Sequence, residues 1–92
     1  MPIRETNAEP DPKAIALGAL GWAVSEGTRA DRLLATTGLD PADLRARAGE
    51  PAVLAAVLGF IEAHEPDLIA CADALGLEPA MLVRARMRLE SE

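Results

Sequence analysis

The sequence predicts an all-α fold, a compact bundle of five to six short helices arranged as two tandem three-helix repeats. Three observations lead to this prediction. Half of the 92 residues are hydrophobic, and Ala and Leu, both strong helix formers, are the most frequent among them. Gly, acidic residues and Pro recur together where one helix would end and the next begin. The chain also matches itself at a fixed offset, the one that carries Gly38 onto Gly76.

The internal match is clearest in two heptapeptides, because Gly38-Leu39-Asp40-Pro41-Ala42-Asp43-Leu44 recurs as Gly76-Leu77-Glu78-Pro79-Ala80-Met81-Leu82. The same offset places Leu20-Gly21-Trp22 on Leu58-Gly59-Phe60. A fixed period is typical of a duplicated supersecondary unit. We therefore expect repeats over about residues 14–49 and 52–89, which should superpose in sequence register. The alternative is that a shared Ala and Leu bias produces the similarity.

Each heptapeptide is predicted to form a corner between two helices. Its Gly suits the left-handed residue that ends a helix. Its acidic residue stands at the start of the next helix, where the helix dipole favours negative charge, and its Pro fits the first helical position. The predicted structural corners are therefore Gly38, Asp40 and Pro41 in the first copy and Gly76, Glu78 and Pro79 in the second.

Residues 1–12 are polar and rich in Pro, and we expect them to form a mobile N-terminal tail before a single helical domain over residues 13–90. The first helix is expected from about Pro12 to Ser25. It is apolar around most of its circumference, so we expect it to lie deep. Gly27 is expected to end it, and Thr28 or a neighbour to open a second helix to about Thr37, with Leu33 and Leu34 facing inward.

The third helix is expected over residues 41–48, with Leu44 as its one large apolar residue, and the fourth over residues 51–64 as the central helix. The fifth is expected to run from Glu65-Pro66-Asp67 to Leu75, with Leu68, Ile69, Ala72 and Leu75 inward. The sixth is expected from Pro79 to about Glu90, with Leu82, Ala85 and Leu89 inward. The predicted core comprises Leu20, Leu34, Leu44, Leu54, Leu58, Ile61, Leu68, Ala72, Leu75 and Leu82.

Composition disfavours several functional classes. Fifteen acidic and nine basic residues give a net charge of −6, which disfavours attraction to nucleic acid or anionic lipid. Cys71 is the only cysteine, so no intramolecular disulfide forms and a cytoplasmic location is expected. The longest apolar runs, residues 14–24 and 52–61, are too short to cross a membrane.

Residues suited to catalysis or metal binding are few. His64 and Cys71 are close in sequence, but Pro66 interrupts the helix between them and no third group is spaced to orient the imidazole. We interpret Cys71 as a small core residue and His64 as a cation at a helix C-terminus. Glu62, His64 and Asp67 lack the spacing of a known metal motif. We expect no enzyme activity and no cofactor.

The alternative function is a helix-turn-helix DNA-binding regulator that uses the helix after Gly76. Ala72, Gly76 and Leu82 have the spacing of this motif, and Arg84, Arg86 and Arg88 resemble phosphate contacts. The residues that would read bases are acidic or apolar, which weakens this hypothesis. Residues two apart lie ~200° apart on a helix, so Arg86 is expected to face away from the other two. No nucleic-acid partner is favoured.

The leading hypothesis is a non-catalytic helical domain that binds an unknown protein or a second copy of itself. The predicted partner surface lies on the sixth helix, where apolar and Arg side chains mix as they do at interfaces, and comprises Met81, Val83, Arg84, Met87 and Arg88. Alternatively, the three apolar residues pack on the first helix. Trp22 and Phe60 are either core anchors or exposed partner contacts. A small-molecule or lipid site between the two repeats is a third hypothesis.

The run TGLDPADLRARAGEPAVLAAVLGFIEAHEPDLIACADALGLEPAMLVRAR, with an apolar helix upstream, resembles the small bacterial proteins of the domain-of-unknown-function 3572 family over about residues 14–90. Its most specific part is GLDPADLRARAG, followed one helix later by the second GLxP corner. TTGLD departs from the more acidic or apolar approach to the Gly that this family leads us to expect. The resemblance implies a compact helical protein without a known activity, cofactor or catalytic residue, so it assigns no functional residue.

Overall fold

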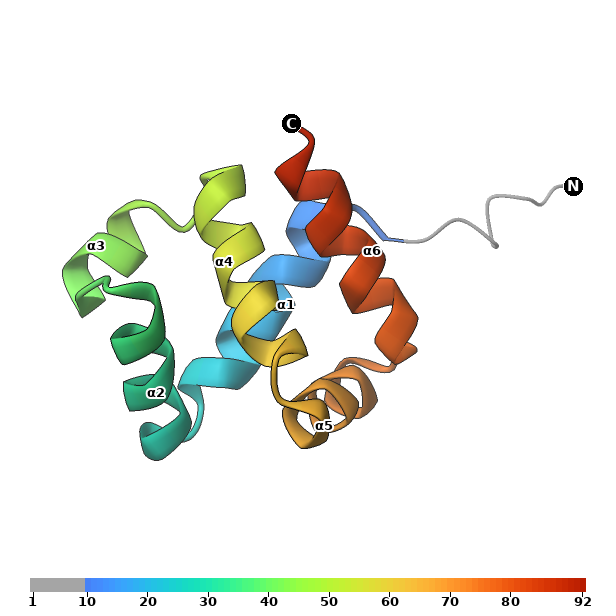
Figure 1. Cartoon of the computed structure of the whole chain (residues 1–92), viewed down its shortest axis with the longest axis horizontal. Coiled ribbons are helices and arrows are strands. Elements are labelled where there is room, and N and C mark those ends of the chain that lie inside the picture. The colour runs from blue at the N-terminus through green and yellow to red at the C-terminus, as the bar shows by residue number, and fades with distance from the viewer. Residues whose placement is uncertain (1–9) are drawn as a thin grey trace, which may run out of the picture.

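The computed structural model describes residues 10–92, which form six α-helices and no strand (Figure 1). The predicted all-α class is confirmed. Most of the tail expected over residues 1–12 lies outside the described residues, and the first helix begins at Pro12. The helices are α1 (Pro12–Val24), α2 (Gly27–Thr37), α3 (Pro41–Ala46), α4 (Pro51–Glu62), α5 (Glu65–Leu75) and α6 (Pro79–Glu90).

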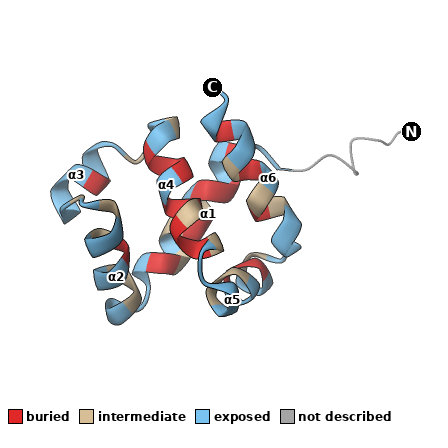
Figure 2. Cartoon of the chain, viewed as in Figure 1, coloured by how far each residue is buried: buried red, intermediate tan, exposed pale blue. Residues whose placement is uncertain are grey.

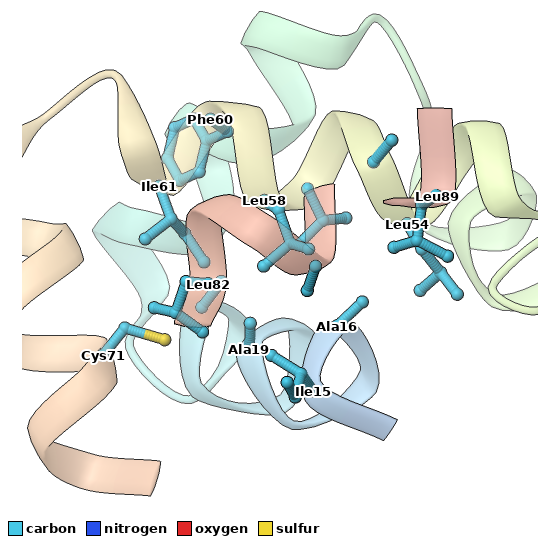
Figure 3. Close-up of a cluster of buried hydrophobic side chains, with 14 of the residues drawn as sticks. Ile15, Ala16, Ala19, Leu54, Leu58, Phe60, Ile61, Cys71, Leu82 and Leu89 are labelled. Carbon is cyan, nitrogen blue, oxygen red and sulfur yellow. The ribbon is translucent and has the colours of Figure 1, made fainter. Parts of the chain in front are cut away.

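The centre of the fold is formed by α1, α4 and α6, which pack against one another (Figure 1). Buried residues are concentrated on these three helices (Figure 2). Leu54, Leu58 and Ile61 of α4 meet Leu82 and Leu89 of α6 in a core of aliphatic side chains (Figure 3). In the described part of the chain, no helix is long and apolar enough to span a bilayer.

The outer helices pack less evenly around this centre. Both α2 and α5 contact α1 and α4, whereas α3 makes only minor contacts with the other helices. α3 has six residues, and Leu44 is its only buried side chain. α6 has 12 residues and buries Leu82, Ala85 and Leu89, as predicted. α6 is therefore an integral part of the core, whereas α3 contributes only Leu44.

Both corners contain a left-handed glycine, with φ of 76° at Gly38 and 70° at Gly76. At the first corner the Asp40 carboxylate accepts a hydrogen bond of 2.8 Å from the Asp43 N–H. Glu78 occupies the corresponding position before α6 but makes no such bond. A Pro follows each acidic residue at the first helical position, where its missing N–H is not needed.

The helix boundaries recur at the offset that relates Gly38 to Gly76. This offset carries both ends of α2, Gly27 and Thr37, onto both ends of α5, Glu65 and Leu75. It also carries the start of α3 onto the start of α6 and the end of α1 onto the end of α4. Superposition of the two halves in space stays a prediction, and the different lengths of α3 and α6 already distinguish them.

Three predicted boundaries are wrong by one or two positions. Gly27 opens α2 instead of ending α1, because the Glu26 carboxylate accepts hydrogen bonds from the N–H groups of Thr28 and Arg29 at 3.1 and 2.9 Å. These bonds favour the ionised carboxylate and lower the pKa of Glu26. α3 ends at Ala46 and α4 at Glu62, both earlier than predicted. His64 is therefore the residue before α5, not a cation in the last turn of α4.

The predicted core is partly correct. Six of the ten residues are buried, and the other four, Leu20, Leu34, Leu68 and Leu75, are half-buried. Ile69 was expected inward but is 53% exposed, because Cys71 and Ala72 form the buried face of α5 and Ile69 lies off that face. α1 does not lie deep on all sides, since Leu17 and Val24 are 47% and 46% exposed.

Leu58→Ala should lower the free energy of unfolding by ~2–5 kcal/mol, because Leu58 is 1% exposed in the central contact and its loss leaves a cavity. Urea unfolding followed by circular dichroism measures the change. Leu17→Ala is the matched control and should cost less than about 1 kcal/mol, because Leu17 is half exposed on α1. Equal losses for the two variants would contradict the assignment of Leu58 to the core.

Candidate functional site

One face of α1 carries apolar side chains that the other helices of residues 10–92 leave partly open. Leu17, Leu20, Gly21 and Val24 follow the i, i+3, i+4, i+7 spacing that places residues on one side of a helix. Leu17 and Val24 are about half exposed, Gly21 is exposed and Leu20 is half-buried. We call these four residues the α1 stripe.

Part of the α1 stripe forms a wall of an apolar groove between α1, α2 and α3. The groove has a volume of about 440 Å³, within the range of binding pockets in general. Arg45 is the only charged residue in the described part of the chain that lines it. The lining comprises Leu20, Val24, Ala30, Leu34, Pro41, Leu44, Arg45 and Ala48. All these residues belong to the first half. A second hollow, of about 580 Å³, lies between residues 32–37 of the first half and residues 56–64 of the second, so a site between the two repeats stays a hypothesis.

The groove exists because α3 is too short to cover α1. In the second half, α6 packs extensively on α4, and Ala55 and Leu58 are buried. At the repeat offset these two residues correspond to Leu17 and Leu20 of the α1 stripe. α3 has half the length of α6, and its minor contacts leave the corresponding face of α1 open.

Leu34 of α2 lines the groove between α2 and α3. Its counterpart in α5 is Ala72, a small residue that is fully buried. A leucine at this position needs more room between the two helices than an alanine does. Leu34 remains half-buried and lines the groove instead.

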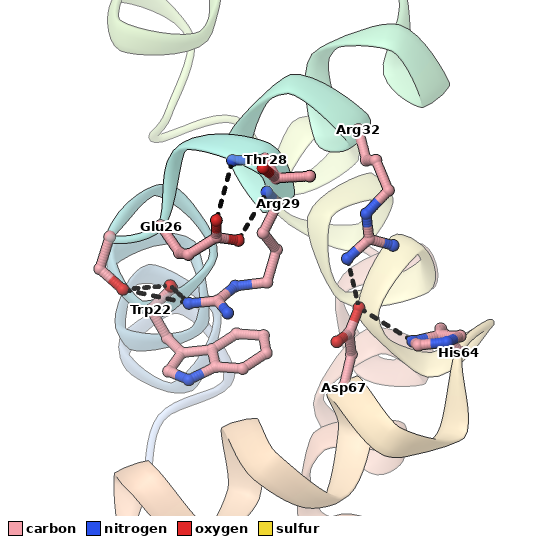
Figure 4. A network of polar contacts seen from close by, with 8 residues as sticks. Trp22, Glu26, Thr28, Arg29, Arg32, His64 and Asp67 are labelled. Atoms are coloured by element: carbon pink, nitrogen blue, oxygen red, sulfur yellow. Dashed lines mark hydrogen bonds and ion pairs between the residues drawn. The ribbon is translucent and has the colours of Figure 1, made fainter.

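The α2 wall of the groove is held to α1 by Arg29 and Trp22 (Figure 4). The guanidinium carbon of Arg29 lies 3.7 Å from the centroid of a Trp22 ring, a cation–π contact. Its Nη2 donates hydrogen bonds to the Trp22 carbonyl oxygen at 2.7 Å and to Ser25 Oγ at 3.2 Å. Arg29 thereby caps the C-terminal end of α1 and fixes the start of α2.

The same helix is held to α5 by Arg32, whose Nη2 donates to Asp67 Oδ2 at 3.2 Å (Figure 4). His64 Nδ1 lies 3.2 Å from the same carboxylate oxygen. The fully buried Leu33 anchors the middle of α2. These contacts of α2 with two other helices indicate that the α1 and α2 walls of the groove are preformed.

The two aromatic residues are covered by arginines of α2. Trp22 is half-buried beneath Arg29, and Phe60 is buried with the Arg32 guanidinium carbon 5.5 Å from its ring centroid. Their role in holding α2 agrees with the expectation of core anchors. Neither ring forms an exposed contact surface.

The partner surface predicted on α6 is less apolar than the groove. Met87 is 56% exposed, but Met81 and Val83 are half-buried. Arg84 and Arg88 are exposed on the same helix. The surface therefore has one large apolar side chain that is mostly open to solvent. It lies apart from the groove, whose lining includes no α6 residue.

Arg86 faces away from Arg84 and Arg88 on α6. Its guanidinium forms ion pairs with Glu62 of α4 and with Glu90 of α6, the second at 2.8 Å. These bonds stabilise the charged guanidinium and raise the pKa of Arg86. Arg86 therefore helps to fasten α6 to α4 instead of extending a basic surface.

Cys71 and His64 do not form a reactive pair in this fold. Cys71 is fully buried, and burial raises the pKa of its thiol to about 11. The thiolate, which is the nucleophilic form, is therefore scarce at neutral pH. His64 is exposed before α5 and contacts Asp67. The interpretation of Cys71 as a core residue is confirmed.

The α1 stripe and the groove are not predicted from the sequence, because the apolar character of α1 indicates burial around most of the helix. The available signal was the length of the third helix, since Gly49 and Pro51 limit it to about two turns whereas no such residues interrupt α6. A second signal was the difference between Val24 of α1 and its counterpart Glu62 of α4, because the two helices do not carry the same residue type at this position.

Comparison with known proteins identifies a family but no characterised relative. The model of the family described as "Protein of unknown function (DUF3572)" matches residues 9–92. No curated protein and no solved structure matches the chain.

Gly21→Ala should raise the free energy of unfolding by ~0.5–1 kcal/mol, because Gly21 is exposed inside α1 and an added Cβ meets nothing within 4 Å. Gly18→Ala is the matched control on the same helix. Its Cβ would lie 3.3 Å from Leu75 Cδ2, so this variant should gain less or lose stability. Chemical denaturation measures both. Destabilisation by Gly21→Ala would contradict an open α1 stripe.

Proposed function

The chain belongs to the DUF3572 family, and we propose that it is a non-catalytic helical domain that binds another protein. In this proposal the binding site is the groove between α1, α2 and α3, together with the adjoining α1 stripe. The observation that carries the proposal is the exposure of Leu17 and Val24 beside a groove with seven uncharged lining residues and one charged one. Contiguous exposed apolar surface on a small domain is typical of interaction sites.

The construction of the groove supports binding without a large rearrangement. Arg29 fixes α2 to α1, and Arg32 fixes it to α5, so the walls contributed by α1 and α2 are in place before a partner arrives. A preformed site loses less conformational entropy on binding than a flexible one. Only α3, with its minor contacts to the other helices, is expected to adjust.

DNA binding is the weaker alternative. The N-terminal end of α6, which would read bases, carries Glu78, Pro79 and Ala80. Arg86 is paired with Glu62 and Glu90, and the chain carries a net charge of −6. These features disfavour attraction to phosphate. A sub-micromolar affinity for duplex DNA at near-physiological salt would contradict this ranking.

Val24→Glu should abolish capture of the partner while leaving the fold intact, because a carboxylate at this half-exposed position would have to lose its water in a mostly apolar interface. The test compares tagged wild-type chain, Val24→Glu and Met87→Glu, purified with bound proteins from cells that naturally contain the chain. Quantitative mass spectrometry measures the recovered proteins.

We expect a protein that is recovered with the wild-type chain and with Met87→Glu. Its recovered amount should be at least about tenfold lower with Val24→Glu. Met87→Glu is the matched control, because it adds the same charge to an exposed apolar position on α6. Loss only with Met87→Glu would move the site to the predicted α6 surface. Recovery that depends on neither position would contradict the proposal.

A further inference from the structure

We infer that the partner inserts a single amphipathic helix, which docks along α1 in the way that α6 docks along α4. This inference rests on the proposed function of the groove and adds the chemistry of the partner. The occupant is a helix of another protein, with aliphatic side chains on the face toward α1 and an acidic side chain next to Arg45.

The first argument is the relation between the two central helices. Ala55 and Leu58 of α4 are buried where α6 packs, at 6% and 1% exposure. Their counterparts in α1 are Leu17 and Leu20, which remain open or half-buried because α3 does not extend over them. The α1 stripe therefore has the composition of a helix-docking face and lacks the helix.

The second argument comes from the glycine within each face. A Cβ placed on Gly59 would lie 3.8 Å from Arg86 Cδ, an ordinary contact distance to a side chain of α6. A Cβ placed on Gly21 would meet nothing within 4 Å. A glycine inside a helix lowers its stability, and a close approach by another helix is the usual structural reason for one. At Gly21 the space for such an approach is present and unfilled.

The third argument concerns charge and selects the occupant. Glu62 pairs with Arg86 across the α4–α6 contact, but Val24 stands at the corresponding position of α1. A docked helix should therefore carry an aliphatic side chain where α6 carries Arg86. The groove's one charged residue, Arg45, favours an acidic neighbour on that helix. The exposed face of α6 in a second copy would bring Arg84 and Arg88 instead, and like charges disfavour it.

The test uses two synthetic helices taken from the chain itself. One spans residues 77–92, stapled through the exposed positions 84 and 88 so that it is helical in solution. The other is identical except for Arg86→Leu. Each carries a fluorophore, and anisotropy measures its binding to the full wild-type chain and to the full Val24→Glu chain.

The wild-type chain and the Val24→Glu chain should prefer opposite helices. The wild-type chain should bind the Arg86→Leu helix more tightly than the parent helix by roughly threefold or more in Kd, since Val24 offers no partner for Arg86. The Val24→Glu chain should prefer the parent helix by a similar factor, because it recreates the Glu62–Arg86 pairing. A synthetic helix that displaces the chain's own α6 does so equally in the wild-type chain and in the Val24→Glu chain. Such displacement therefore does not produce the reversal.

Gly21→Leu is a second variant, which should weaken both helices by blocking the close approach, while circular dichroism shows an unchanged fold. Met87→Glu should change neither affinity.

Absence of measurable binding to the wild-type chain at several hundred micromolar, or the same preference in both proteins, would overturn the inference. If Val24→Glu removes a natural partner but neither helix binds, the proposed function holds and a helical partner is wrong. If the helices show the reversal but no natural partner depends on Val24, the inference holds and the proposed function fails.

Discussion

Close packing of α1, α4 and α6 against one another is the interaction on which the other features of this structure depend. The chain has only two aromatic residues, so its core is built from aliphatic side chains that each bury a modest area. Small residues on facing helices, such as Ala16 and Ala19 of α1 and Ala85 of α6, are fully or almost fully buried and allow the helix axes to approach. The close approach gives Leu54, Leu58 and Ile61 complete burial, although the domain is small.

The same packing explains why the two halves differ in what they expose. α6 continues for 12 residues, covers α4 and is fastened to it by the Arg86–Glu62 pair. α3 ends at Ala46 after six residues, and Gly49 lies in the short connection to Pro51, the first residue of α4. The similar segment of α1 consequently keeps its apolar side chains partly open.

Local sequence signals predicted most of the fold. Pro residues marked the starts of α1, α3, α4 and α6, and the two left-handed glycines marked the ends of α2 and α5. The cap formed by Glu26 was missed, because a neighbouring glycine suggested a helix end. The exposure of Val24 and Ile69 was also missed. Their apolar character is visible in the sequence, but whether another helix reaches them depends on tertiary packing, which local periodicity does not specify.

Hydrogen exchange of the native chain, measured residue by residue by NMR, tests the central claim that α6 belongs to the core and α3 does not. The account predicts that backbone amides in the middle of α6, such as that of Ala85, exchange only through global unfolding. The amides of Leu44 and Arg47, which donate to the Asp40 and Asp43 carbonyl oxygens, should exchange far faster through local opening of α3. Equal protection of the two helices would contradict the account, because α3 would then be packed as firmly as α6 and the α1 stripe would need a different explanation.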